Sequence, residues 1–227
     1  MNSQIISSVV KKLIMSISGA FLILFISFHM TMNIVALFSV EAYNALCEFL
    51  GANWYALAGT LVLAGGVAIH VIMALWLTIT NRIARGNLRY AVTRQEPGVS
   101  WASKNMLVLG FVILGGLLLH LYNFWFHMQF TEIIGRHENA FGFSPSDGGA
   151  LIQYWFSQPL FVVLYLIWFA AIWLHLTHGF WSMFQSVGWA NAKWYPRLKW
   201  IANIYATLII AGFAAVAIIF YIKSLCS

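Results

Sequence analysis

Charged residues are scarce in this sequence. Aspartate, glutamate, lysine and arginine make up 8% of its 227 residues, whereas hydrophobic residues make up 62%. A soluble globular domain carries roughly 25% charged residues, so the composition argues against a soluble protein and indicates an integral membrane protein. The formal net charge is +6. Its basic residues lie in short segments beside apolar runs, which is typical of membrane topology rather than of nucleic-acid binding.

Cysteine is also nearly absent, since Cys47 and Cys226 are the only two. Two cysteines exclude a cysteine-ligated iron–sulfur cluster within this chain, and the sequence has no Cys-x-x-Cys-His haem attachment motif. The first apolar run, from Leu13, is too long for a signal peptide and lacks a small-residue cleavage site. We therefore expect no cleaved signal.

Five uncharged runs are long enough to cross roughly 30 Å of hydrocarbon, which takes about 20 helical residues. They cover about residues 13–38, 54–80, 105–130, 159–187 and 200–222. The sequence therefore predicts an all-α fold, with residues 1–227 forming a single membrane domain built as a five-helix bundle. Segment 131–157 is rich in glycine, and we expect it to be an irregular external loop with a turn at 144–148.

The basic residues predict the orientation of the bundle. Segments 1–12, 81–104 and 188–199 hold ten of them: Lys11, Lys12, Arg82, Arg85, Arg89, Arg94, Lys104, Lys193, Arg197 and Lys199. The alternate segments hold only Arg136 and Lys223. Cytoplasmic loops of membrane proteins carry an excess of lysine and arginine. We therefore expect a cytoplasmic N-terminus and an external C-terminus.

Two apolar runs contain the same pattern, a glycine pair followed by a histidine. Gly65-Gly66 precedes His70, and Gly115-Gly116 precedes His120. Imidazole is costly in hydrocarbon, so an intramembrane histidine is a functional hypothesis by default. Gly66 and Gly116 lie four residues earlier on the same helical face, where they would leave room for a flat cofactor. The alternative is that the small residues simply let helices pack closely.

Depth groups the membrane histidines into pairs. At about 1.5 Å per helical residue, His29 and His120 lie about 22–25 Å from the cytoplasmic ends of their runs, whereas His70 and His178 lie about 14–16 Å from theirs. The sequence thus predicts an outer pair, His29 and His120, and an inner pair, His70 and His178. Each pair could give one iron two axial imidazoles, as in a b-type haem.

Other histidines compete for these roles. By depth alone His175 could replace His178, although Gly179 beside His178 leaves room there and favours the latter. His127 follows His120 by seven residues, on the same helical stripe and near the outer interface. It could be an aromatic-belt residue, a partner of a haem propionate or a proton-handling group.

With one histidine in each of the first four runs, the chain resembles the dihaem cytochrome b membrane anchors of the succinate dehydrogenase/fumarate reductase (succinate:quinone oxidoreductase) family. The resemblance covers nearly the whole chain. It is carried by Ser18-Gly19, Phe28-His29-Met30, Ala68-Ile69-His70, His120-Leu121-Tyr122 and His178-Gly179-Phe180, the last running into Phe184-Gln185-Ser186-Val187-Gly188.

The resemblance implies two haems b, with His29 and His120 as axial ligands of the outer iron and His70 and His178 of the inner iron. It implies a quinone substrate, with menaquinone favoured. It also implies a flavoprotein subunit carrying FAD, an iron–sulfur subunit docked on the cytoplasmic face, and a bacterial cytoplasmic membrane. The complex would be the enzyme, and this chain alone would not oxidise succinate.

Further residues have roles only by this resemblance. Arg82, with its neighbours Arg85 and Arg89, could pair with inner-haem propionates or dock the iron–sulfur subunit, or could simply follow the positive-inside rule. Glu41 and Glu48 precede the second run, where the family places a carboxylate at its quinone site. Both are therefore candidates for passing protons to the quinone.

Three other functions fit parts of the pattern. Another respiratory haem b subunit, such as that of nitrate reductase, has five helices but takes its ligands in pairs from two of them. A transporter with histidine proton relays would want intramembrane aspartate or glutamate, which the five runs lack. A structural anchor without haem would leave four midplane histidines unexplained.

Overall fold

The computed structural model describes residues 7–85 and 101–226. Its long helices are α1 (Ser8–Phe38), α3 (Trp54–Arg85), α5 (Met106–His120), α8 (Pro159–Ser186) and α9 (Trp194–Cys226). Helix α5 continues without a break into the π-helix η1 (Leu121–Phe130) and the short α6 (Thr131–Ile133). The described chain thus contains five helical rods long and apolar enough to cross a membrane. This confirms the predicted all-α, five-helix membrane architecture.

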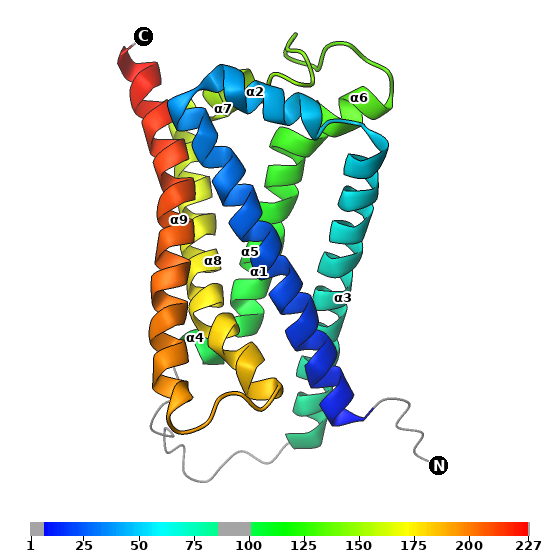
Figure 1. Ribbon diagram of the computed structural model, residues 1–227, viewed down its shortest axis with the longest axis vertical. Helices are drawn as coiled ribbons and strands as arrows, with labels where there is room; N and C mark the ends of the chain where they lie inside the picture. Colours follow the sequence, from blue (N-terminus) through cyan, green and yellow to red (C-terminus); the bar gives the residue numbers. More distant parts are fainter. Residues whose placement is uncertain (1–6, 86–100, 227) are drawn as a thin grey trace.

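The short helices α2 (Val40–Phe49) and α7 (Gly148–Phe156) lie across the upper end of the bundle in Figure 1. The expected irregular loop over 131–157 is confirmed for residues 134–147, which include the predicted turn. It was wrong at both ends, where α6 and α7 lie. Helix α7 begins where the carboxylate of Asp147 accepts a hydrogen bond from the Ala150 amide, as an N-cap does. It persists because it buries Leu151, Ile152 and Trp155 against the bundle.

Polar caps extend two of the long helices beyond the predicted runs. Helix α9 begins at Trp194 rather than near residue 200, because the side-chain oxygen of Asn191 accepts hydrogen bonds from the amides of Lys193 and Trp194. Helix α1 begins at Ser8, where the hydroxyl of Ser7 accepts from the Val10 amide. Hydropathy identifies the apolar part of a spanning helix, but it does not predict the polar helical turns that extend the helix beyond that part.

Helices α8 and α9 pack along each other, and α1 crosses them obliquely (Figure 1). The core between these three helices combines fully buried alanines, Ala206 and Ala217, with the rings of Tyr165, Phe169 and Phe220. Small residues let helix backbones approach closely in a membrane. Helix α5 packs on the other side of α8.

Helix α3 is the most loosely held of the long helices. It packs along α1 and only lightly against α5, and Figure 1 draws it at the edge of the bundle. Among the described residues of α3, Met73 is the only buried one. Its many exposed apolar side chains suit a lipid-facing helix.

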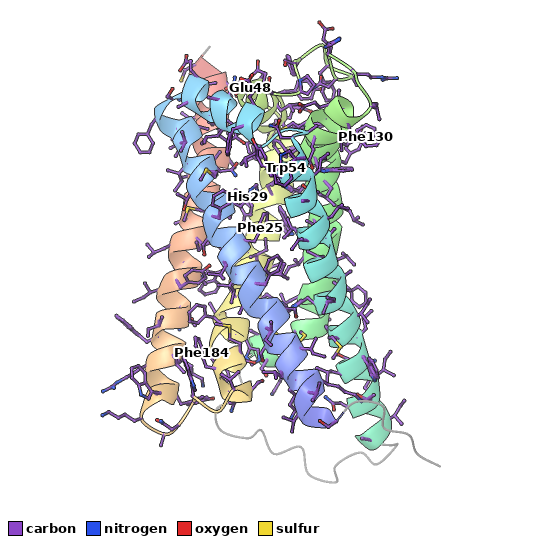
Figure 2. All side chains as sticks on the ribbon, turned by 45° about the vertical axis from the view of Figure 1, so that its right-hand side comes forward. Phe25, His29, Glu48, Trp54, Phe130 and Phe184 are labelled. Carbon is purple, nitrogen blue, oxygen red and sulfur yellow. The ribbon has the colours of Figure 1, made fainter. Side chains whose placement is uncertain are left out.

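The two ends of the bundle differ in charge. The first described residues lie at the lower end of Figure 1 and the C-terminus at the upper end. Helix ends at the lower end carry Lys11, Lys12, Arg82, Lys104, Lys193, Arg197 and Lys199. Arg89 and Arg94, which belong to the same predicted cytoplasmic group, lie outside the described residues. Figure 2 places Glu48 at the opposite, upper end.

Candidate cofactor sites between the helices

The structure brings His29 of α1 and His120 of α5 together. Their ring centres are 5.7 Å apart and the ring planes are nearly perpendicular, at 81°. His29 stacks on Phe25, 5.4 Å away, and also contacts Phe213 of α9; Figure 2 shows Phe25 and His29 on the upper half of α1. The predicted outer histidines are therefore neighbours in an aromatic part of the bundle.

His120 lies among further rings. Phe124, Tyr165 and Trp168 have ring centres 5.2–6.2 Å from it. Its Nδ1 is buried without a hydrogen-bond partner in the described part of the chain. A buried polar atom without a partner costs about 1–3 kcal/mol. His120 Nδ1 is thus buried among aromatic rings, and no described protein group forms a hydrogen bond with it.

A second pair joins His70 of α3 to His175 of α8. The ring centres are 6.2 Å apart with an interplanar angle of 64°. Two glycines border this pair. A Cβ at Gly19 of α1 would lie 3.6 Å from His70 Cε1, and one at Gly179 would lie 4.0 Å from His175 Cδ2.

This pairing differs from the expected one of His70 with His178. The His178 ring instead contacts Trp181, whose own ring contacts Tyr195 of α9, and the described ring contacts of His70 do not include it. Three helical residues turn the chain by about 300°, whereas four turn it by about 400° and return to nearly the same face. Gly179 therefore leaves room beside His175, four residues earlier, and the geometry favours His175 as the partner of His70.

The two pairs lie at different depths along α1. Gly19 faces His70, and His29 lies ten residues further along the same helix, a distance of about 15 Å. The structure thus contains two histidine pairs at two levels, and the inner one, His70 with His175, is not the pair that the sequence predicts.

The spacing within each pair suits one metal ion between two imidazoles. A nitrogen ligand lies about 2 Å from a bound transition metal, so two imidazoles on opposite sides of one iron have ring centres about 6 Å apart. The observed values are 5.7 and 6.2 Å. The described residues contain no group of three or more histidine, cysteine, aspartate or glutamate side chains able to hold a metal ion.

Gly66 and Gly116 both pack against aromatic rings. A Cβ at Gly66 would collide with the ring of Phe21, and a Cβ at Gly116 would collide with the indole of Trp168. Gly65 and Gly115 face open space, with no atom within 4 Å of a Cβ. In this structure aromatic rings thus fill the space beside Gly66 and Gly116, and both glycines allow close packing.

His127 does not share the stripe of His120. Residues 121–130 form a π-helix, in which each hydrogen bond spans one more residue than in an α-helix. The wider turn directs His127 toward Phe141, with ring centres 4.6 Å apart, and toward Trp155 of α7. It is only 2% exposed, and both of its ring nitrogens lack a hydrogen-bond partner among the described residues. It lies away from the rings that surround His120.

The π-helix and its surroundings hold buried polar groups that hydropathy did not reveal. The Gln129 amide oxygen accepts hydrogen bonds from Thr60 of α3 and from Trp125, and its nitrogen donates to the carbonyl of Gly51. The Trp155 indole donates to the carbonyl of Asn123. π-helical segments are rare and frequent at functional sites, but nothing in the residue pattern marks one.

The predicted acidic and basic candidates lie near the ends of the bundle. Glu41 and Glu48 are exposed on α2, and with Asn44 and Asp147 they line a shallow, open depression. Glu41 accepts a hydrogen bond from Ser39, and this bond and a backbone one hold the pKa of its carboxyl below the usual range. Arg82 is exposed near the end of α3, about 18 Å along the helix from His70.

No family model, curated protein or solved structure matches the chain.

Proposed function

We propose that this chain is a dihaem cytochrome b subunit of a bacterial succinate:quinone oxidoreductase. It would anchor a flavoprotein and an iron–sulfur subunit and carry electrons between the iron–sulfur subunit and a membrane quinone, with menaquinone favoured. The observation that carries this proposal is the presence of two cross-helix histidine pairs, at two depths, each with the spacing of a bis-imidazole site.

We assign His29 and His120 to the outer haem, and His70 with His175 to the inner haem. When bound, each haem supplies a one-electron carrier. The protein contributes two imidazoles per site and an aromatic wall that keeps water away, formed at the outer site by Phe25, Phe213 and Trp168 among others. A dry site of low polarity is one of the means by which a protein sets a haem potential.

The direct test is a reduced-minus-oxidised absorption spectrum of the purified membrane protein with pyridine-haem quantitation. We expect two haems b per chain. A preparation that folds and contains no haem would overturn the proposal, and a single haem would restrict it to one histidine pair.

We further propose that the lower end in Figure 1 is cytoplasmic and receives the iron–sulfur subunit, because the described basic residues gather there. The two cysteines allow a test. Cys226 is exposed near the C-terminus, whereas burial raises the pKa of the Cys47 thiol to about 11. A membrane-impermeant maleimide added to intact cells should label Cys226, and C226S should abolish the label. Labelling only after the cells are opened would reverse the orientation.

We place the quinone site near α2, with Glu48 as the proton donor. Glu41 already binds Ser39, and its lowered pKa keeps it ionised as the pH falls, so it is the weaker donor. E48Q should slow quinone-linked turnover of the assembled complex and leave succinate oxidation by an artificial dye unchanged. E41Q, on the same helix, is the matched control and should retain quinone turnover. Equal rates for the two variants would remove Glu48 from this role.

A further inference from the structure

A chain of two hydrogen bonds connects α1 to the inner histidine pair. The Ser18 hydroxyl donates to the backbone carbonyl of Met15, 3.0 Å away, one turn earlier in α1. The same oxygen lies 3.2 Å from His70 Nδ1, across the interface between α1 and α3. Ser18 is only 7% exposed, so water does not readily replace either partner.

The bond to Met15 assigns a direction to the bond with His70. A serine hydroxyl has one hydrogen and can accept further hydrogen bonds at its oxygen. With that hydrogen directed at Met15, the oxygen accepts from His70, and Nδ1 of His70 then carries the proton. A neutral imidazole with Nδ1–H has its free lone pair on Nε2.

We propose that Ser18 is a positioning residue for the inner site. It holds His70 in the Nδ1–H tautomer and fixes the ring orientation, leaving Nε2 as the only nitrogen available to a metal. This inference rests on the proposed function, since it assigns the coordinating atom of an inner haem ligand. Ser18 acts through His70 and is not itself proposed as a ligand.

The outer pair has no equivalent contact at His120. The Nδ1 atom of His120 is buried without a hydrogen-bond partner among the described residues. A partner on the outer ring nitrogen of a metal-bound histidine orients the ring and raises its basicity as a ligand. A more basic ligand stabilises the oxidised iron. Ser18 should therefore lower the potential of the inner haem without acting on the outer one.

The test compares S18A with S27A in the complete, haem-loaded protein. Both variants remove a hydroxyl from α1. Ser27 bonds to the carbonyl of Ile23 and to Tyr205, so S27A is a matched control away from His70. The readouts are a potentiometric titration of each haem and the rate of haem transfer to an external acceptor. H70A, which should lack the inner haem, identifies the signal that belongs to it.

In S18A we expect the midpoint potential of the inner haem to shift upward and that of the outer haem to stay unchanged. Loss of an outer-shell partner of a metal ligand typically costs about 10- to 100-fold in metal affinity, so one haem of the two should leave at least tenfold faster. S18T, which keeps a hydroxyl, should restore both properties, and S27A should match the parent protein.

Unshifted potentials in S18A would overturn the inference, as would the same shift in S27A. If S18A yields no folded protein, S18C replaces it, since a thiol is a similar but weaker acceptor. A smaller upward shift in S18C would support the role of Ser18 and no shift would refute it. Two haems in the parent with unshifted variants refute only this inference, whereas a parent without haem refutes the proposed function.

Discussion

The two histidine pairs differ in what holds them in place. His29 and His120 lie on α1 and α5, among rings contributed by α8 and α9. His70 lies on α3, which packs on α1 and only lightly on α5. Its partner His175 belongs to α8, in which six described residues are buried, whereas α3 has only one. The outer pair is thus part of the packed core, whereas the inner pair links a loosely held helix to that core.

The difference indicates how each site depends on its cofactor. At the outer site, aromatic packing already fixes both imidazoles, so a bound haem would add little to the position of α1 or α5. At the inner site, a haem coordinated by His70 and His175 would itself connect α3 to α8. A group that binds only the folded state stabilises it, and at the inner site this stabilisation would be concentrated on α3.

The largest expected effect is the loss of one haem from the inner pair. H175A should reduce the haem content from two to one per chain, because the ring that faces His70 is removed. H178A is the matched control, three residues along the same helix, and should retain two haems because that ring contacts Trp181 instead. Pyridine-haem quantitation measures both. One haem in H178A and two in H175A would restore the assignment made from the sequence.

The second prediction concerns the dependence of α3 on the inner site. H70A should accelerate amide hydrogen exchange along α3 by about tenfold or more, equivalent to ~1.4 kcal/mol of local stability. H29A should leave exchange in α3 close to that of the parent, because His29 contacts α5 and α9. Exchange measured by mass spectrometry in detergent micelles separates the two. Equal acceleration in both variants would contradict the comparison.

The third prediction tests the packing beside His120. G116A should destabilise the protein by about 1–3 kcal/mol, as overpacking does. The new methyl group meets the Trp168 indole, which is fixed by a hydrogen bond to the carbonyl of Ile113. G115A adds the same methyl group in open space, where alanine favours the helix by about 0.5–1 kcal/mol. The midpoint of thermal unfolding should fall for G116A and not for G115A. Similar midpoints for the two variants would mean that Trp168 can move aside to accommodate the methyl group.

The smallest expected effect is at the outer end of α3. T60V removes the hydrogen bond from Thr60 to Gln129, 2.8 Å long, that joins α3 to the π-helix. Side-chain hydrogen bonds between membrane helices average about 0.6 kcal/mol, and Gln129 keeps a bond from Trp125. T78V, on the same helix, removes only a bond to its own backbone and should cost less. Equal unfolding free energies for T60V and T78V would show that the Thr60–Gln129 hydrogen bond does not stabilise the packing of α3.

Hydropathy predicted the five spans because their length and lack of charge are properties of the sequence. It did not predict α7, which depends on a single cap at Asp147 and on a buried face that only the folded bundle defines. The helix ends differ for a similar reason, since Asn191 extends α9 through a local hydrogen bond.

The candidate sites were also predictable only in part. Depth along each run was enough to group His29 with His120, and to place His70 at a second level, because helical rise is constant. Depth could not choose between His175 and His178, which differ by less than one turn. The choice depends on the rotation of α8 against α3, and that rotation is set by packing.

The π-helix has a consequence for insertions and deletions in the third span. Each π-type hydrogen bond takes one residue more than an α-type bond, so the segment 121–130 holds surplus residues relative to its length. Deleting one residue there would rotate the chain that follows by about 100°. Gln129 and Glu132, which bind Gly51 and the Ala52 amide respectively, would then face away from the start of α3. We expect this span to tolerate side-chain changes in the segment better than a change in its residue count.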